Sequence, residues 1–191
     1  MLLGEQLYLS AKGFLAGQLI GRAFAAHLND RAAHPPWPWA DFHPIARLEV
    51  PRMGVRRHVV TGGSGTSMAF GIGHLDGTAM PNAPGNCVLV GHRDTWLRFL
   101  RALETGDLLH VTTAGETRGY QVSAIEVVDH TDETIIDPAR RGLTLVTCYP
   151  FDGWRGSPWR YAVLCRPLSR RGSAGSPVPI RCAPSLGTAG T

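Results

Sequence analysis

Cys148 is the residue of this sequence best placed for covalent chemistry. It closes the apolar run 143–148 and is followed by Tyr149 and Pro150. Because proline stops a β-ladder, we expect a strand to end at Cys148, where its side chain can face a cleft. A thiolate at such a place can attack a peptide carbonyl. Cysteines on apolar strands are more often small buried hydrophobes, so the position alone does not establish catalysis.

A thiol nucleophile needs a proton-transfer partner, and the sequence contains 8 histidines. His92 follows the apolar strand predicted over 86–90 and begins a polar turn, so it also lies at a strand end. An imidazolium there would lower the pKa of the thiol and give its proton to a leaving amine. His74, in a glycine-rich stretch, is the main rival. The remaining histidines fall in the predicted helix, linker or strand interiors, apart from His130, which follows a strand in a less clearly defined setting.

An oxyanion formed during attack on a carbonyl would be stabilised by a fixed cation. Arg160 opens the last predicted strand and is our candidate, because a guanidinium stays charged and donates in a planar fork. Arg155, in the preceding loop, and Arg93, beside His92, remain alternatives.

The elements that would position these residues are mostly β-strands. Frequent glycine (23) and proline (14) indicate many turns. We expect a mainly β fold, a barrel with short helices. The glycine-rich stretch 63–77 is expected to be loop apart from a helical turn at 66–70, and 95–105 a short helix. Further strands are predicted near 45–60 and at 86–90, 108–112, 119–128, 143–148 and 159–164.

Four segments divide the chain. We expect an N-terminal helix at 1–29, a Pro/Trp linker at 30–44, a catalytic barrel at 45–168 and a disordered tail at 169–191. A length of 191 residues suits one domain with such extensions.

The helix at 1–29 is too short of apolar residues to predict a membrane span. Its longest candidate run covers nine residues, 13–21, whereas a spanning helix needs roughly 20. We interpret it as a docking helix and the remnant of a membrane-anchor region. A ladder at i+4 spacing should form its apolar stripe: Leu3, Leu7, Ala11, Leu15 and Leu19.

Charge and cysteine spacing exclude other classes of protein. The net charge is +4 but the arginines are scattered, which argues against nucleic-acid binding. The spacing of the 4 cysteines matches no usual zinc pattern, so no metal site is predicted.

Three segments together resemble the sortase family of cysteine transpeptidases. Leu143-Thr144-Leu145-Val146-Thr147-Cys148 is similar to the TLxTC signature of that family. Residues 90–95 (VGHRDT) resemble its catalytic histidine segment, and 159–163 (WRYAV) its arginine-bearing last strand. Finer segments resemble the sortases of Gram-negative bacteria in particular: 36–41, 69–74 and 147–152.

The resemblance implies an eight-stranded sortase-like β-barrel without a required cofactor. It implies catalysis by His92, Cys148 and Arg160, with His74 not catalytic. Four residues are expected to contact the substrate: Thr147, Asp94, Trp159 and His74.

The implied partners are a protein bearing a C-terminal sorting signal of the Leu-Pro-x-Thr-Gly type and an amine acceptor. The implied location is the cell envelope, membrane-anchored or on the periplasmic side of the inner membrane. The residues leave two alternatives open: a cysteine peptidase of the same fold that releases acyl groups to water, and a non-catalytic peptide-binding barrel.

Overall fold

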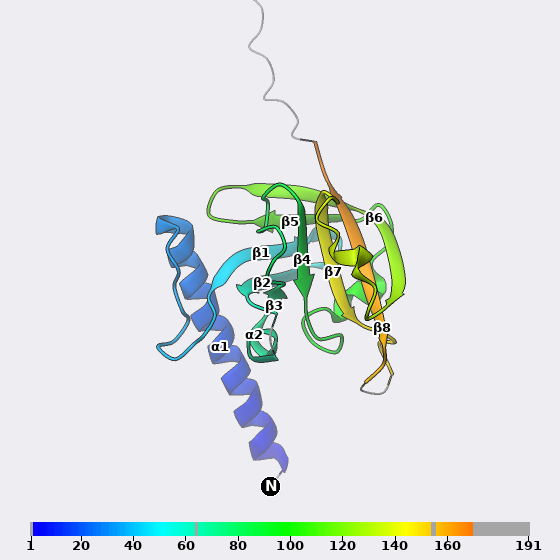
Figure 1. Cartoon of the computed structure of the whole chain (residues 1–191). Coiled ribbons are helices and arrows are strands. Elements are labelled where there is room, and N and C mark those ends of the chain that lie inside the picture. Colours follow the sequence, from blue (N-terminus) through cyan, green and yellow to red (C-terminus); the bar gives the residue numbers. More distant parts are fainter. Residues whose placement is uncertain (1, 64, 154–155, 170–191) are drawn as a thin grey trace, which may run out of the picture.

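Eight strands close into a barrel in the computed structural model, which describes residues 2–63, 65–153 and 156–169 (Figure 1). Neighbouring strands follow the order β1-β2-β3-β4-β7-β8-β6-β5, and β5 pairs with β1 to close the ring. The predicted mainly β, eight-stranded barrel is confirmed. Its strands are β1(Pro44–Val50), β2(Val55–Thr61), β3(Ile72–His74), β4(Asn86–Val90), β5(Leu108–Thr112), β6(Thr117–Asp129), β7(Gly142–Cys148) and β8(Trp159–Pro167).

Helical elements in the described residues are few and mostly short. They are α1(Leu2–Asp30), η1(Pro51–Met53), α2(Gly65–Phe70), η2(Arg98–Ala102) and η3(Glu133–Ile136), where η denotes a 3-10 helix. Only α1 is long, and Figure 1 shows its N-terminal end extending beyond the barrel.

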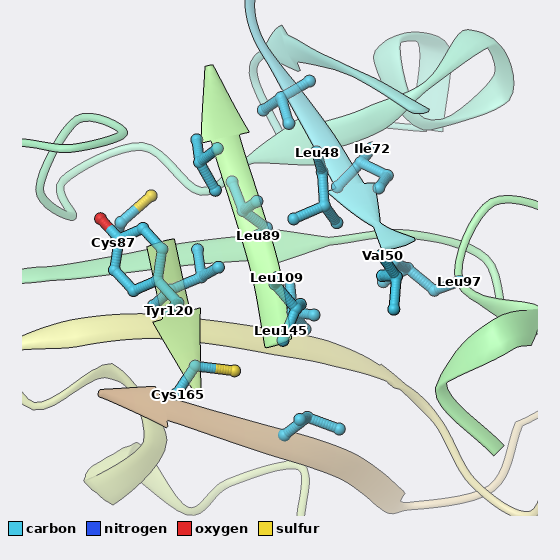
Figure 2. Close-up of a cluster of buried hydrophobic side chains, with 14 of the residues drawn as sticks. Leu48, Val50, Ile72, Cys87, Leu89, Leu97, Leu109, Tyr120, Leu145 and Cys165 are labelled. Atoms are coloured by element: carbon cyan, nitrogen blue, oxygen red, sulfur yellow. The ribbon is translucent and has the colours of Figure 1, made fainter. Parts of the chain in front are cut away.

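The interior of the barrel is filled by aliphatic side chains from every other position of the strands. Leu48, Leu89, Leu109 and Leu145 have no exposed surface and lie in one cluster (Figure 2). Alternation with period two directs these side chains inward, because successive Cβ atoms of a strand point to opposite faces. This packing fixes the strands whose ends carry the site.

The C-terminal part of α1 packs on the barrel through a stripe different from the one predicted. Ile20, Ala23 and Phe24 are buried, and the Phe24 ring meets the His58 ring edge-on at 5.4 Å. Leu15 is 59% exposed, so the expected i+4 ladder is wrong at that position. No helix in the described residues is long and apolar enough to cross a bilayer.

The linker lies against the barrel rather than away from it. Trp37 contacts Phe42 and Phe70 edge-on, with ring centroids 5.5 and 5.0 Å apart. Trp39, by contrast, is exposed. The linker therefore ties the end of α1 to α2.

Strand β3 and helix η2 differ from the sequence-based expectations. Residues of β3 were predicted as loop, but they pair in parallel with β2. Gly73 allows this close approach, because an added Cβ would lie 2.5 Å from the carbonyl oxygen of Gly62. The helix predicted over 95–105 is replaced by turns and η2.

The reason for the 3-10 geometry lies in the leucine spacing. Leu97, Leu100 and Leu103 are buried and recur every three residues, the repeat of a 3-10 helix. An α-helix would instead spread them over about 120° of its circumference.

Candidate active site

The register of three neighbouring strands brings His92, Cys148 and Arg160 to one edge of the barrel. Parallel strands β4 and β7 place Val90 beside Val146, so each chain continues two residues further to His92 and Cys148. Antiparallel strands β7 and β8 place Arg160 directly across from Cys148. Residues 56 and 12 positions apart in the sequence thus become neighbours at strand ends.

A buried hydrogen bond joins the two segments that carry the cysteine and the histidine. The Thr147 hydroxyl donates to the carbonyl oxygen of Gly91 at 2.7 Å, and Thr147 is 3% exposed. Gly91 fits closely under the following turn, because an added Cβ would lie 3.0 Å from Leu97. The backbone on both sides of the site is therefore held firmly.

Cys148 and His92 open into the same cavity, of about 440 Å³. Its described lining residues are His92, Arg93, Asp94, Cys148, Gly156 and Ser157. Strand alternation buries Thr147 and exposes Cys148, so the thiol reaches this space while its backbone stays within the ladder.

The other described cysteines lie in the barrel interior. Cys87 and Cys165 are buried, and desolvation raises the pKa of each thiol to about 12. Because the thiolate is the nucleophile, neither can react readily. Cys148 is the exposed thiol of the described residues, and Cys182 falls outside them.

Arg160 is held by its own hairpin. Its Nη1 donates to the carbonyl oxygens of Ser157 and Trp159, each at 3.0 Å. Ser157 lines the cavity and Arg160 does not, so the guanidinium contacts a lining residue without being one. The rival Arg155 lies outside the described residues.

Arg93 fastens the loop after Cys148 to the turn after His92. Its guanidinium donates to the carbonyl oxygen of Pro150 at 2.8 Å and to that of Gly153. These bonds span 57 and 60 positions of sequence. Arg93 therefore holds together two segments that border the cavity.

The four residues expected to contact substrate take up different places. Asp94 lines the cavity, whereas Thr147 is turned towards Gly91. Trp159 is 48% exposed at the start of β8. His74 is buried, with its Nε2 bonded to the Ala79 carbonyl oxygen at 3.0 Å, and is absent from the described lining.

Two lining residues, Gly156 and Ser157, were not among the site residues predicted from the sequence. They belong to the connection between β7 and β8, which must close over the ends of both strands. The signal was available: the loop of a hairpin that carries Cys148 at one end and Arg160 at the other has to border the site.

The arrangement suits nucleophilic acyl transfer. It combines an exposed thiol, an imidazole in the same cavity and a guanidinium on the adjoining strand. Within the described ranges, no three His, Cys, Asp or Glu side chains gather closely enough to hold a metal ion.

Comparison with known proteins agrees with the geometry. The family model of the sortase domain matches residues 48–168. Sortase D of Bacillus subtilis (strain 168) is 33% identical over 118 residues, which are 61% of this chain and 60% of that protein.

Solved structures share the fold. Sortase A from Corynebacterium diphtheriae superimposes with a TM-score of 0.61 at 27% identity, over 73% of this chain and 66% of that one. A Clostridium perfringens Sortase D5 transpeptidase gives a TM-score of 0.65 at 22% identity, over 80% and 99% of the two chains.

The match covers less than two thirds of the length of Sortase D and of Sortase A. The finer resemblance to Gram-negative sortases stays a prediction. The region matched by the family model includes His92, Cys148 and Arg160 and extends over more than half of the 191 residues, so this chain belongs to the sortase family.

Proposed function

We propose that this protein is a cysteine transpeptidase. It cleaves a C-terminal sorting signal of the Leu-Pro-x-Thr-Gly type and transfers the acyl group to an amine. The observation that carries the proposal is the shared cavity of the exposed Cys148 and His92 at two paired strand ends. Membership of the sortase family supports it.

In the first step, the Cys148 thiolate forms a C–S bond to the threonine carbonyl carbon of the substrate. Arg160 stabilises the negative charge that develops on the carbonyl oxygen. The threonine–glycine C–N bond then breaks, and the His92 imidazolium gives its proton to the leaving glycine amine. The products are a thioester on Cys148 and a neutral His92.

In the second step, the nitrogen of the acceptor amine forms a C–N bond to the same carbonyl carbon. His92 takes the proton that this nitrogen loses. The C–S bond breaks, which returns the Cys148 thiolate and leaves a new amide. Water in place of the amine would give an acid, so the acceptor decides between transfer and hydrolysis.

The reaction takes place at the cell envelope, where sortases are found. We place this protein at the membrane there, because α1 extends past the barrel and could hold the domain near a lipid surface (Figure 1). Its partners are a protein bearing the sorting signal and an amine acceptor.

The test is mass spectrometry of the protein and products after incubation with a Leu-Pro-x-Thr-Gly peptide, with and without an added amine. We expect an acyl adduct on Cys148, an amide when amine is present, and neither in Cys148→Ala. Cys165→Ala is the matched control, because it removes a buried thiol on the adjacent strand and should still form the adduct.

Each other result has a defined meaning. Acid alone, whatever the amine, identifies a hydrolase. Peptide binding without any adduct identifies a non-catalytic binding barrel. Turnover retained in Cys148→Ala removes Cys148 as the nucleophile.

A further inference from the structure

A second hollow adjoins the active-site cavity. It has a volume of about 230 Å³ and is lined by Arg93, Asp94, Arg98, Arg101, Phe151 and Asp152. Arg93 and Asp94 line both spaces, so the two share a wall. A molecule in this hollow therefore lies next to the cavity that contains Cys148.

The hollow is rich in guanidinium groups. Arg98 and Arg101 are three positions apart in η2, and a 3-10 helix stacks such residues on one face. Both are exposed. Three arginines against Asp94 and Asp152 give a formal charge of +1 (3 − 2) for the lining.

Two of these arginines are available to a ligand. Arg101 lies 3.8 Å from a carboxylate oxygen of Asp152, whose side chain is 91% exposed, so this ion pair is weak. Arg98 makes no ion pair within the described part of the chain. Arg93 instead donates to backbone carbonyl oxygens and contributes mainly to the shape of the hollow.

The side of the hollow that Phe151 forms is held in place by packing. Phe151 packs edge-on against Tyr161, with ring centroids 5.0 Å apart, and both rings contact the barrel core. The loop that carries Phe151 is held by the bonds from Arg93 to Pro150 and Gly153. The guanidinium groups of Arg98 and Arg101 thus border a preformed surface.

We propose that this hollow is the acceptor subsite and that it selects an amine which carries a free carboxylate. Arg98 and Arg101 bind the carboxylate through charge-assisted hydrogen bonds, while the amine reaches the thioester on Cys148 across the shared wall. The ligand class is an amino acid or short peptide with a free C-terminus. The inference rests on the proposed transpeptidase function.

The test compares two acceptors that differ in the carboxylate, glycylglycine and glycylglycinamide, in reactions of the full chain with the sorting-signal peptide. We expect kcat/KM for the carboxylate-bearing acceptor to be about fivefold higher, in line with one or two solvent-exposed charge pairs. Raising the salt from about 50 mM to about 500 mM should reduce this ratio, because exposed charges are screened.

Arg98→Gln and Arg101→Gln should each lower the ratio about twofold, and the double variant should bring it close to one. Arg166→Gln is the matched control. It removes an exposed arginine at the opposite end of β8 from Arg160, where Arg166 donates to Gln121. The ratio should not change in this variant.

Acyl-enzyme formation on Cys148, measured without acceptor, separates failure of this inference from failure of the function. No adduct at all would overturn the transpeptidase proposal. An adduct that both acceptors resolve equally well, that glycylglycinamide resolves faster, or that neither resolves would overturn the carboxylate subsite alone. A ratio that Arg98→Gln and Arg101→Gln leave unchanged would overturn their role.

Discussion

Replacing Thr147 by valine tests whether the hydrogen bond from Thr147 to Gly91 aligns Cys148 with His92. Valine keeps the volume and the β-branched shape of threonine but cannot donate to the carbonyl oxygen of Gly91. Thr147 is 3% exposed, so water does not readily replace the lost donor. The substitution therefore removes one hydrogen bond between the segments that carry Cys148 and His92.

The magnitude follows from the burial of that bond. Leaving a buried carbonyl unsatisfied costs about 1–3 kcal/mol of unfolding free energy. For a domain of this size, each kcal/mol lowers Tm by about 2–4 °C, so Tm should fall by about 2–12 °C. A shift of the two segments by a fraction of an ångström to 1 Å should reduce kcat for acyl-enzyme formation by about 10- to 100-fold.

Thr144→Val is the matched control. Thr144 lies on the same strand, is fully buried, and donates to Oδ1 of Asn86 on β4 at 2.8 Å. It should cost a similar unfolding free energy, but it lies near the opposite end of β7 from Cys148 and should leave kcat nearly unchanged. Calorimetry measures Tm, and rapid-quench mass spectrometry measures acyl-enzyme formation.

The comparison separates stability from alignment. If both variants lose stability but neither loses kcat, the bond from Thr147 to Gly91 does not align the site. If both lose kcat equally, the effect is a general consequence of weakening the β4–β7 ladder. If Thr147→Val retains the wild-type Tm, the burial argument itself is wrong.

Three other predictions follow from the contacts around the site and α1. Arg160→Ala should lower kcat by about 10²–10³-fold with little change in KM, because the oxyanion forms only after attack; steady-state kinetics measures this. Arg93→Ala frees the loop held at Pro150 and Gly153 and should lower kcat about tenfold, with partial rescue by lysine. Burial lowers the pKa of His58, so below about pH 6.5 the unfolded state binds protons more readily than the folded state. As the pH falls below this value, Tm should therefore decrease, and it should decrease less steeply in His58→Gln.

Each of these has a contrary outcome. A large rise in KM with unchanged kcat in Arg160→Ala would indicate substrate binding rather than oxyanion stabilisation. Full activity of Arg93→Ala would show that the loop after Cys148 keeps its position without the hydrogen bonds from Arg93. An identical decline of Tm with pH in His58→Gln would assign the acid sensitivity to another group, such as His43, whose pKa burial also lowers.

The strand ends that carry the chemistry could be predicted from local signals. The apolar run before Cys148 and the proline after it mark where β7 ends, and a similar run precedes His92. What no local signal indicates is that β4 and β7 are parallel neighbours, since this depends on the closure of the whole barrel. The resemblance to sortases implied an eight-stranded barrel and joint action of His92, Cys148 and Arg160, but not this pairing.

Other parts of the structure depend on contacts that a sequence pattern does not display. Strand β3 is three residues long and contains Gly73, so neither length nor β-propensity indicated it. The packed stripe of α1 is set by where Phe24 meets His58, not by the ladder that includes Leu15. His74, the main rival of His92, is buried at the end of β3 with its Nε2 bonded to the Ala79 carbonyl oxygen, and it does not line the cavity of Cys148.

The parallel pairing of β4 with β7 also has a consequence for the nascent chain. Asn86 pairs with Gly142, so this ladder forms only when two segments 56 positions apart in the sequence come together. Contacts at such separation form late, because the entropy of closing a long loop has to be overcome first. A chain caught part-way through synthesis or folding would already contain Cys148 but would have no imidazole beside it. The proposed transpeptidase activity is therefore expected only in molecules whose barrel has closed.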